Sequence, residues 1–76
     1  MVYAYVMVKT AAGKSDGLLA AIREMAPVES AHIVAGNYDI IVEVEAAEVY
    51  DVLSTVSSEI QALDGVTDTR TYIAMH

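Results

Sequence analysis

The first ten residues, MVYAYVMVKT, are nearly all apolar and are rich in valine and tyrosine. A run of this length and composition predicts a strand over residues 1–10. Successive side chains of a strand point to opposite faces, so Tyr3, Tyr5 and Met7 share one face and the valines lie on the other. A strand with one solvated face would alternate with polar residues. Because both faces of this strand are apolar, we expect each of them to be covered.

Two later segments repeat apolar residues at the spacing of one helical face. In the first, Ser15 can cap the N-terminus of a helix that Pro27 ends. Its apolar positions are Leu18, Ala21, Ile22 and Met25. The second helix runs from about Ala47 to Gly65, which occupies the place of a left-handed C-terminal cap. Its apolar positions are Val49, Val52, Leu53, Val56, Ile60 and Leu63.

The remaining segments predict three more strands. One runs from 28 to about 35, and a tight turn at 36–38 leads into another at 39–45, so that this pair forms a hairpin. The final strand runs from 66 to about 75.

The two halves of the chain share one plan. Shifting the chain by 38 residues, half of its 76, places Ile22 on Ile60 and Val28 on Val66. Each half is a strand, a helix and a strand. The order βαββαβ predicts an α+β fold of the ferredoxin-like type, with a four-stranded antiparallel sheet and both helices on one face. Residues 1–76 are expected to form a single domain.

The uncovered sheet face predicts a partner. A chain of this size buries only about 60% of its unfolded surface, so its core is thin. It has no cysteine, and its histidines, His32 and His76, are far apart, so neither a disulfide nor a metal is expected to support the fold. The sheet of a second subunit is the natural cover, which predicts a dimer that packs through its sheets. The expected interface residues are Tyr3, Tyr5, Met7 and Ile41.

Charge narrows the choice of partners. Eleven acidic and four basic residues give a net charge of −7, which repels phosphate backbones and anionic lipid. No apolar run approaches the ~20 residues of a membrane span, and the N-terminus lacks the features of a signal peptide. We therefore expect a cytoplasmic protein with no direct nucleic-acid or membrane partner. The acidic excess is also typical of proteins from a high-salt cytoplasm, and the composition leaves that question open.

Two segments carry candidate binding chemistry. Residues 36–39 combine a glycine, an aromatic ring and a carboxylate, and Thr67, Thr69 and Thr71 alternate along the final strand. Both patterns also have a structural explanation, since turns favour such residues and threonine is a good strand former. If the two segments approach each other, within one subunit or across a boundary, they could hold a small zwitterion. Its carboxylate would bind hydroxyls and backbone N–H groups, and its ammonium would bind a carboxylate.

Candidate catalytic groups are sparse. His32 lies mid-strand, where a packed or hydrogen-bonded histidine is more common than a base or ligand, and the pattern of Glu43 and Glu45 with Asp39 is typical of a solvated rim. The sequence has no phosphate loop, nucleophile elbow or CxxC motif. No catalytic residue, metal ligand or cofactor is assigned. The catalytic alternative, a cofactor-free oxygenase or isomerase, would need His32 in an enclosed pocket within one subunit.

Several motifs resemble a known family. They are Val8-Lys9-Thr10, Met25-Ala26-Pro27-Val28, the G-x-Y-D motif at 36–39, Leu63-Asp64-Gly65-Val66 and Thr69-Arg70-Thr71. Together they resemble the effector-binding half, or RAM domain, of the Lrp/AsnC family of feast/famine regulators. The resemblance implies a dimeric α/β barrel that assembles into rings of dimers, with small effectors, typically amino acids, in clefts between dimers. It maps the effector contacts to Gly36, Asn37, Tyr38, Asp39, Thr69 and Thr71.

One departure from the family matters. Family regulators carry an N-terminal helix-turn-helix, whereas this sequence opens directly on the first strand, so it is similar to the stand-alone members. The expected function is amino-acid sensing and oligomerisation without catalysis, which modulates transcription or metabolism, with co-assembly with a full-length regulator as one route. The alternatives are a small dimeric ferredoxin-like enzyme and a structural adaptor.

Overall fold

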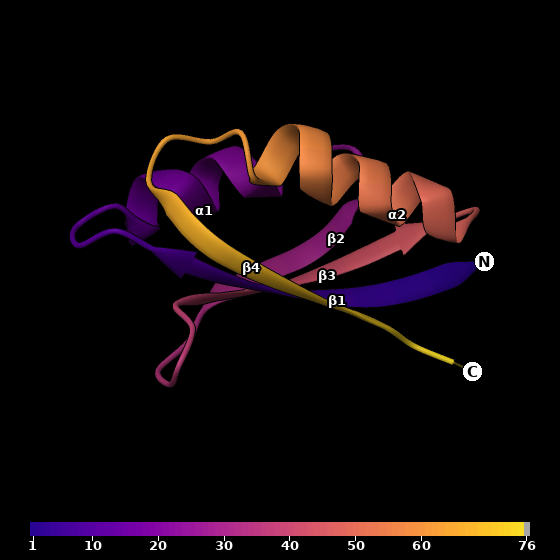
Figure 1. Cartoon of the computed structure of the whole chain (residues 1–76), viewed down its shortest axis with the longest axis horizontal. Helices are drawn as coiled ribbons and strands as arrows, with labels where there is room; N and C mark the ends of the chain where they lie inside the picture. Colours follow the sequence, from indigo (N-terminus) through magenta and orange to yellow (C-terminus); the bar gives the residue numbers. More distant parts are fainter. Residues whose placement is uncertain (76) are drawn as a thin grey trace.

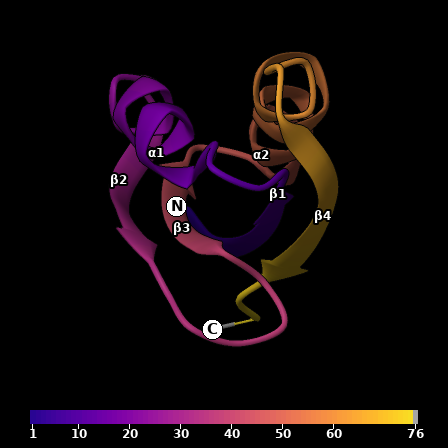
Figure 2. The same cartoon turned by 90° about the vertical axis from the view of Figure 1, so that its left-hand side faces the viewer.

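Four strands form one antiparallel sheet, and both helices lie on the same face of it, in the computed structural model of this chain (Figures 1 and 2). The structure describes residues 1–75, and His76 lies outside the described residues. In chain order the elements are β1 (Val2–Thr10), α1 (Ser15–Arg23), β2 (Val28–Ile33), β3 (Ile40–Ala46), α2 (Val49–Thr55), a π-helical turn η1 (Val56–Ile60) and β4 (Val66–Ile73). The predicted βαββαβ ferredoxin-like fold is confirmed.

The strand order β2-β3-β1-β4 places β1 in the interior of the sheet. Val6 at its centre lies opposite Val42 of β3 on one side and Thr71 of β4 on the other, in antiparallel pairs. The crossovers β1–α1–β2 and β3–α2–β4 therefore interleave, as the repeat of the two halves predicted.

The core lies between the sheet and the helices. Val6 and Val8 of β1 are fully buried, as are Ile22 of α1 and Ile60 of η1. The equivalent residues of the two halves, Ile22 and Ile60, thus occupy one core. Val49 and Leu53 of the predicted helical stripe lie instead at the rim, about half exposed.

The helix boundaries differ from expectation. Ser15 is the first residue of α1 and not its cap: the capping position is Lys14, which makes no side-chain cap bond. The Ser15 hydroxyl is instead hydrogen-bonded to that of Thr10, at 2.8 Å. The helix ends at Arg23, before Pro27 is reached. In the second helix the hydrogen-bond pattern changes from α-helical to π-helical at η1, where the Gln61 N–H donates to the carbonyl of Val56 at 2.9 Å.

The predicted tight turn at 36–38 is wrong. Strand β2 ends at Ile33 rather than near residue 35, and residues 34–39 form a longer connection, closed by a hydrogen bond from Val34 N–H to the Asp39 carbonyl at 2.9 Å. Among the residues described, positive φ occurs at Gly13 and at Gly65, not at Gly36, so no primed turn forms here. The connection projects from the side of the sheet opposite the helices (Figures 1 and 2).

Candidate ligand-binding site

The sheet face opposite the helices carries a mixed apolar and charged surface, which we call the open face. Strand register places Tyr3, Tyr5 and Met7 of β1 beside Glu45, Glu43 and Ile41 of β3. The expected interface residues Tyr3, Tyr5, Met7 and Ile41 therefore share this face, with Tyr3 and Tyr5 44% and 40% exposed. The dimer itself stays a prediction. The other members of the open face, by register, are Lys9, Ser30, His32, Asp68, Arg70 and Tyr72.

Asp39 anchors the β2–β3 connection to the end of β1. Its Oδ2 accepts hydrogen bonds from the backbone N–H of Thr10 at 2.8 Å and from the Thr10 hydroxyl at 3.2 Å. Its own backbone N–H donates to the carbonyl of Val8 at 2.9 Å. The Asp39 carboxylate thus accepts a hydrogen bond from a backbone N–H group, which is the role that a purely structural explanation of the G-x-Y-D motif assigns to it. Both of its bonds to Thr10 use Oδ2, so Oδ1 is the oxygen that could serve a ligand.

Two cations meet the connection on the open face. Lys9 Nζ donates to the carbonyl of Asn37 at 2.9 Å and lies 5.9 Å from the centroid of the Tyr38 ring, within cation–π range. A side-chain hydrogen bond with Tyr38 raises the pKa of Arg70, and the charge of Asp68 adds to this effect. Tyr38 is therefore a neighbour of both Lys9 on β1 and Arg70 on β4.

The threonines lie on the other side of the sheet. Thr69 and Thr71 pair with Val8 and Val6, whose side chains are buried beneath the helices, so both threonines face the helix layer. The Thr69 hydroxyl accepts a hydrogen bond from Gln61 Nε2 at 2.8 Å. Thr67 is separate, because its hydroxyl donates to the carbonyl of Lys9 at 3.2 Å. The three hydroxyls thus do not form one ligand surface.

One chain does not bring the six predicted contacts together. Gly36, Asn37, Tyr38 and Asp39 are contiguous in the connection, next to β1. Thr69 and Thr71 lie on β4, beyond β1, and face the helices. A site that uses both groups therefore needs a second subunit.

A cluster of carboxylates occupies the opposite end of the open face. Glu29 is the bulged residue where β2 leaves its register with β3. A side-chain hydrogen bond with Glu45, and the negative charge of that group, raise the pKa of Glu29. The charge of Glu45 also raises the pKa of the neighbouring Tyr3, with help from partial desolvation. Glu43 raises both pKa values further, so these groups repel one another in the single chain.

His32 lies exposed on the open face rather than in an enclosed cavity. It borders a hollow of about 140 Å³ that opens to solvent and is shared with Tyr5, Ser30, Ile41 and Glu43. Among residues 1–75, no three His, Cys, Asp or Glu side chains are grouped so that they could hold a metal ion. Within the same range, neither helix is long and apolar enough to cross a membrane.

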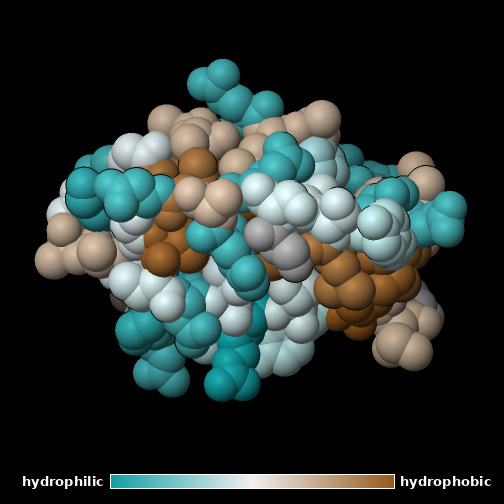
Figure 3. Space-filling view, turned by 45° about the horizontal axis from the view of Figure 1, so that its top comes forward, coloured by the Kyte–Doolittle hydropathy of each residue, from teal (hydrophilic) through white to brown (hydrophobic). Residues whose placement is uncertain are grey.

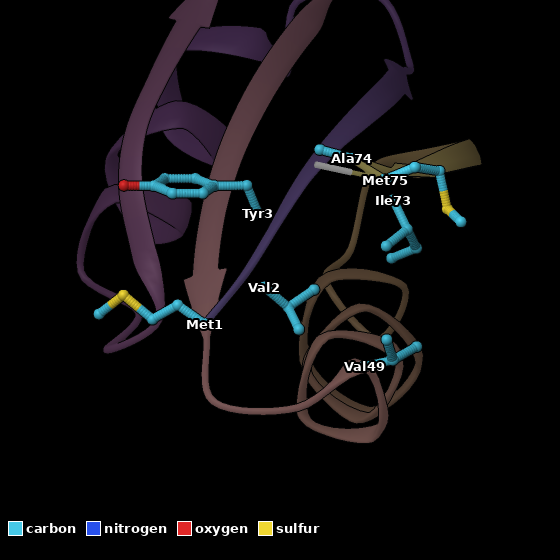
Figure 4. Close-up of a pocket in the computed structure, with 7 residues that line it drawn as sticks. All are labelled: Met1, Val2, Tyr3, Val49, Ile73, Ala74 and Met75. Atoms are coloured by element: carbon cyan, nitrogen blue, oxygen red, sulfur yellow. The ribbon is translucent and has the colours of Figure 1, made fainter.

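A second hollow, of about 290 Å³, lies between the start of β1, the start of α2 and the end of β4. Apolar side chains also reach the surface of the helix layer between polar ones (Figure 3). Within the hollow, Val2, Val49 and Ile73 point toward one another, whereas Tyr3 points away from them (Figure 4). The sequence predicted no pocket at this end of the sheet.

Sequence reasoning missed Lys9, Thr10 and Arg70 as neighbours of the G-x-Y-D segment. The sequence did contain a signal for two of them, because Lys9 is adjacent to Thr10 and Arg70 is adjacent to Thr69 in the family motifs. Period-two alternation places Arg70 on the face opposite Thr69. Only the sheet register shows that Lys9 and Arg70 meet Tyr38 on one face.

Comparison with known proteins points to one family. Residues 3–76 match the family model described as the Lrp/AsnC ligand binding domain. The leucine-responsive regulatory protein of Haemophilus influenzae is 30% identical over 56 residues, which cover 74% of this chain. The chain spans about a third (34%) of the length of that curated relative.

Solved structures share the fold. FFRP-DM1 superimposes with a TM-score of 0.93 at 33% identity, and the match covers 99% of this chain and 100% of the other. A transcriptional regulator from Neisseria meningitidis, in complex with L-Met, superimposes with a TM-score of 0.87, over 99% of this chain and 50% of its own. At 17% identity, this second likeness shows the fold alone.

Proposed function

Because this chain belongs to the Lrp/AsnC ligand-binding domain family, we propose that it is an amino-acid-sensing, self-associating module without catalysis of its own. It acts in the cytoplasm and modulates transcription or metabolism through its state of assembly. Its partners are a second copy of itself, a small effector and, in one route, a full-length regulator of the same family.

The observation that carries the proposal is the way in which the β2–β3 connection is held. Asp39 Oδ2 fixes the connection to Thr10 and leaves Oδ1 for an ammonium group, while Gly36 and Asn37 stay exposed beside it. The Thr69 hydroxyl accepts from Gln61, which leaves its proton free to donate to a carboxylate. An amino acid held between the connection of one subunit and the threonines of another would satisfy both of its charges.

The comparisons support this choice of ligand. The Neisseria regulator, which has the same fold, was solved with L-Met, and the Haemophilus relative is named for its response to leucine. Both names point to an amino acid with an apolar side chain. We transfer that ligand class to this chain as part of the proposal.

The charge of the chain supports a role without direct contact with DNA. A net charge of −7 opposes binding to a phosphate backbone, so an effect on transcription would pass through another protein. The exposed position of His32 does not favour the enzymatic alternative, which needs an enclosed pocket.

Calorimetry against the twenty amino acids, with the assembled protein, tests the sensor role. We expect saturable heat with an apolar amino acid. Asp39→Asn keeps an acceptor for Thr10 but removes the charge that faces the ammonium, and should weaken binding by roughly tenfold. Thr69→Val should weaken it as well. Asp16→Asn, at an exposed position of α1, is the matched control and should change nothing. No heat with any of the twenty would overturn the sensor role.

A further inference from the structure

The hollow of about 290 Å³ between the start of β1, the start of α2 and the end of β4 is a gap at one end of the core. We call it the end hollow. Its apolar walls are Val2, Val49 and Ile73, whose side chains point toward one another (Figure 4). Val2 lies two residues before the buried Ala4, and Ile73 pairs with Ala4, so both walls lie on the helix side of the sheet. The end hollow therefore separates the sheet from α2 and is not part of the open face.

The protein leaves these apolar walls uncovered. Met1 and Met75 also line the end hollow, but both side chains are almost fully exposed and do not fill it. Leu53 follows Val49 by four residues, so the two lie on the same side of α2, where each is about half exposed. A strip of apolar surface thus continues from the end hollow along α2.

The charge on this side of the molecule has one sign. Residues 24–69 contain no lysine or arginine, and all the acidic side chains of the protein except Asp16 lie in this stretch. It includes the whole of α2. At the start of that helix, Glu48 and Asp51 are exposed close to Val49. The apolar strip therefore lies in acidic surroundings.

The cations of the described chain lie elsewhere. Lys9 and Lys14 lie at the β1–α1 connection, at the other end of β1, and Arg70 is opposite Met7 on the open face. The guanidinium of Arg23 donates two hydrogen bonds to a carbonyl of β2, at the edge of the sheet opposite β4. The negative charge around the start of α2 is therefore not compensated by a neighbouring cation.

We propose that the end hollow and the adjoining strip of α2 bind a basic amphipathic segment of another protein. One apolar side chain of that segment enters the end hollow, and a second covers Leu53. Lysines or arginines beside these anchors face Glu48 and Asp51. A helix with one apolar face and cationic flanks has this chemistry, since its anchors recur three or four residues apart. This surface is separate from the proposed effector contacts, which lie at the other end of β1.

The size of the end hollow favours a protein segment over a free small molecule. Ligand pockets commonly measure about 300–1,000 Å³ and bury most of the ligand. The end hollow is at the lower limit of that range and opens to solvent. A single anchor side chain needs less room, and the strongest contacts of protein interfaces are anchors seated in such pockets. Charge adds selectivity, because it attracts a basic partner and repels an acidic one.

Two synthetic amphipathic peptides test the proposal, one of leucine and lysine and one of leucine and glutamate with the same apolar pattern. Fluorescence anisotropy of each labelled peptide measures its binding to the full chain. We expect the lysine peptide to bind saturably and the glutamate peptide not to bind. Added salt should weaken binding, because it screens the exposed charges.

The apolar anchor is tested at one wall of the end hollow. Val49→Gln places a good helix former at a half-exposed position of α2, so the variant should fold, and it should bind the lysine peptide roughly tenfold more weakly. Ile33→Gln is the matched control, at an equally exposed apolar position at the other end of the sheet, and should leave binding unchanged. Circular dichroism establishes that both variants fold.

The charges are tested with paired substitutions. Glu48→Gln combined with Asp51→Asn should weaken binding of the lysine peptide by roughly threefold and reduce its dependence on salt. Asp16→Asn combined with Glu24→Gln removes the same two charges from exposed positions on and beside α1. This matched control should bind as the wild type does.

Methyl NMR locates the contact. The lysine peptide should shift the methyl signals of Val2, Val49 and Ile73 and leave those of Ile33 in place. Equal binding by the wild type and Val49→Gln, or shifts confined to other surfaces, would overturn the proposal, because net charge alone would then explain the binding. Failure of the wild type to bind, together with loss of self-association in Val49→Gln, would also overturn it and would identify a second copy of the chain as the occupant. None of these outcomes bears on amino-acid binding, which calorimetry tests separately.

Discussion

At the scale of single residues, the polar chemistry of the β2–β3 connection first serves the fold. The carboxylate of Asp39 accepts a hydrogen bond from the backbone N–H of Thr10, the last residue of β1. Lys9 lies within cation–π range of the Tyr38 ring, and Arg70 is a neighbour of the same side chain from a second strand. A substitution that removes Asp39 therefore changes stability as well as any ligand contact, and the two effects must be measured separately.

Asp39→Ala should lower the free energy of unfolding by about 1–2 kcal/mol, because it leaves the partly buried Thr10 N–H without its acceptor. Asp39→Asn should cost less, since its amide oxygen can still accept that hydrogen bond. Urea unfolding of the three proteins measures the difference. Equal stability of the alanine variant and the wild type would show that the contact contributes nothing.

The Glu29–Glu45 contact should be visible in a pH titration. Because the folded state raises the pKa of Glu29, this carboxyl contributes stability that is fully present below the unfolded value, about 4.3, and is lost as pH rises through the folded value. Glu45→Gln removes the negative neighbour, so the Glu29 titration midpoint should fall. Carbon NMR of the Glu29 carboxyl measures it, and Glu48→Gln, at the N-terminus of α2, is the control that should not shift it.

At the scale of elements, periodicity located all four strands and both helices but not their ends. The apolar spacing of Val52, Val56 and Ile60 predicted one helical face, and all three are buried. It did not predict the π turn at Val56–Ile60, because a widened turn keeps the same apolar residues in the core. The predicted hairpin of β2 and β3 is present. The turn residues at 36–38 suggested that a tight turn joins its strands, whereas the structure has a longer connection that accepts hydrogen bonds from Thr10 and Lys9.

Gly65 and Gly36 should respond oppositely to alanine. At Gly65, φ is +102° and an added Cβ would lie 3.1 Å from the Cβ and Cγ of Lys14, so Gly65→Ala should cost about 1–3 kcal/mol. At Gly36, φ is not positive and no described heavy atom lies within 4 Å of such a Cβ. Gly36→Ala should be neutral or should stabilise by about 0.4–1 kcal/mol. Thermal unfolding compares the two, and equal losses would contradict the assignment.

At the scale of the whole molecule, one sheet face is covered and the other is not. Helices α1 and α2 bury the valines of β1, while the tyrosines of the same strand stay partly exposed. A chain of this size has little core to spare, so covering the open face would change its stability appreciably. Assembly and folding are then expected to be linked.

The melting temperature should rise with protein concentration, because association stabilises the folded state by mass action. Raising the concentration from about 1 to 100 μM should raise it by several degrees. Tyr5→Glu, which puts a charge at the centre of the open face, should abolish this dependence. Leu53→Glu, on the half-exposed rim of α2, is the control and should retain it. A concentration-independent melting temperature for the wild type would contradict the linkage.

The sequence by itself determined the elements, their order and the two-faced character of the sheet, because these follow from local periodicity and from the repeat of one plan in two halves. Tyr3, Tyr5, Met7 and Ile41 could be assigned to one face from alternation alone. The tertiary structure alone decided which distant residues meet. In the fold, Lys9 and Arg70 are neighbours of Tyr38, and Asp39 accepts a hydrogen bond from Thr10. Thr69 and Thr71 lie on the opposite side of the sheet and face the helices. Such meetings depend on strand register, which a bulge at Glu29 or at Lys9–Thr10 shifts by one residue and which no local pattern records.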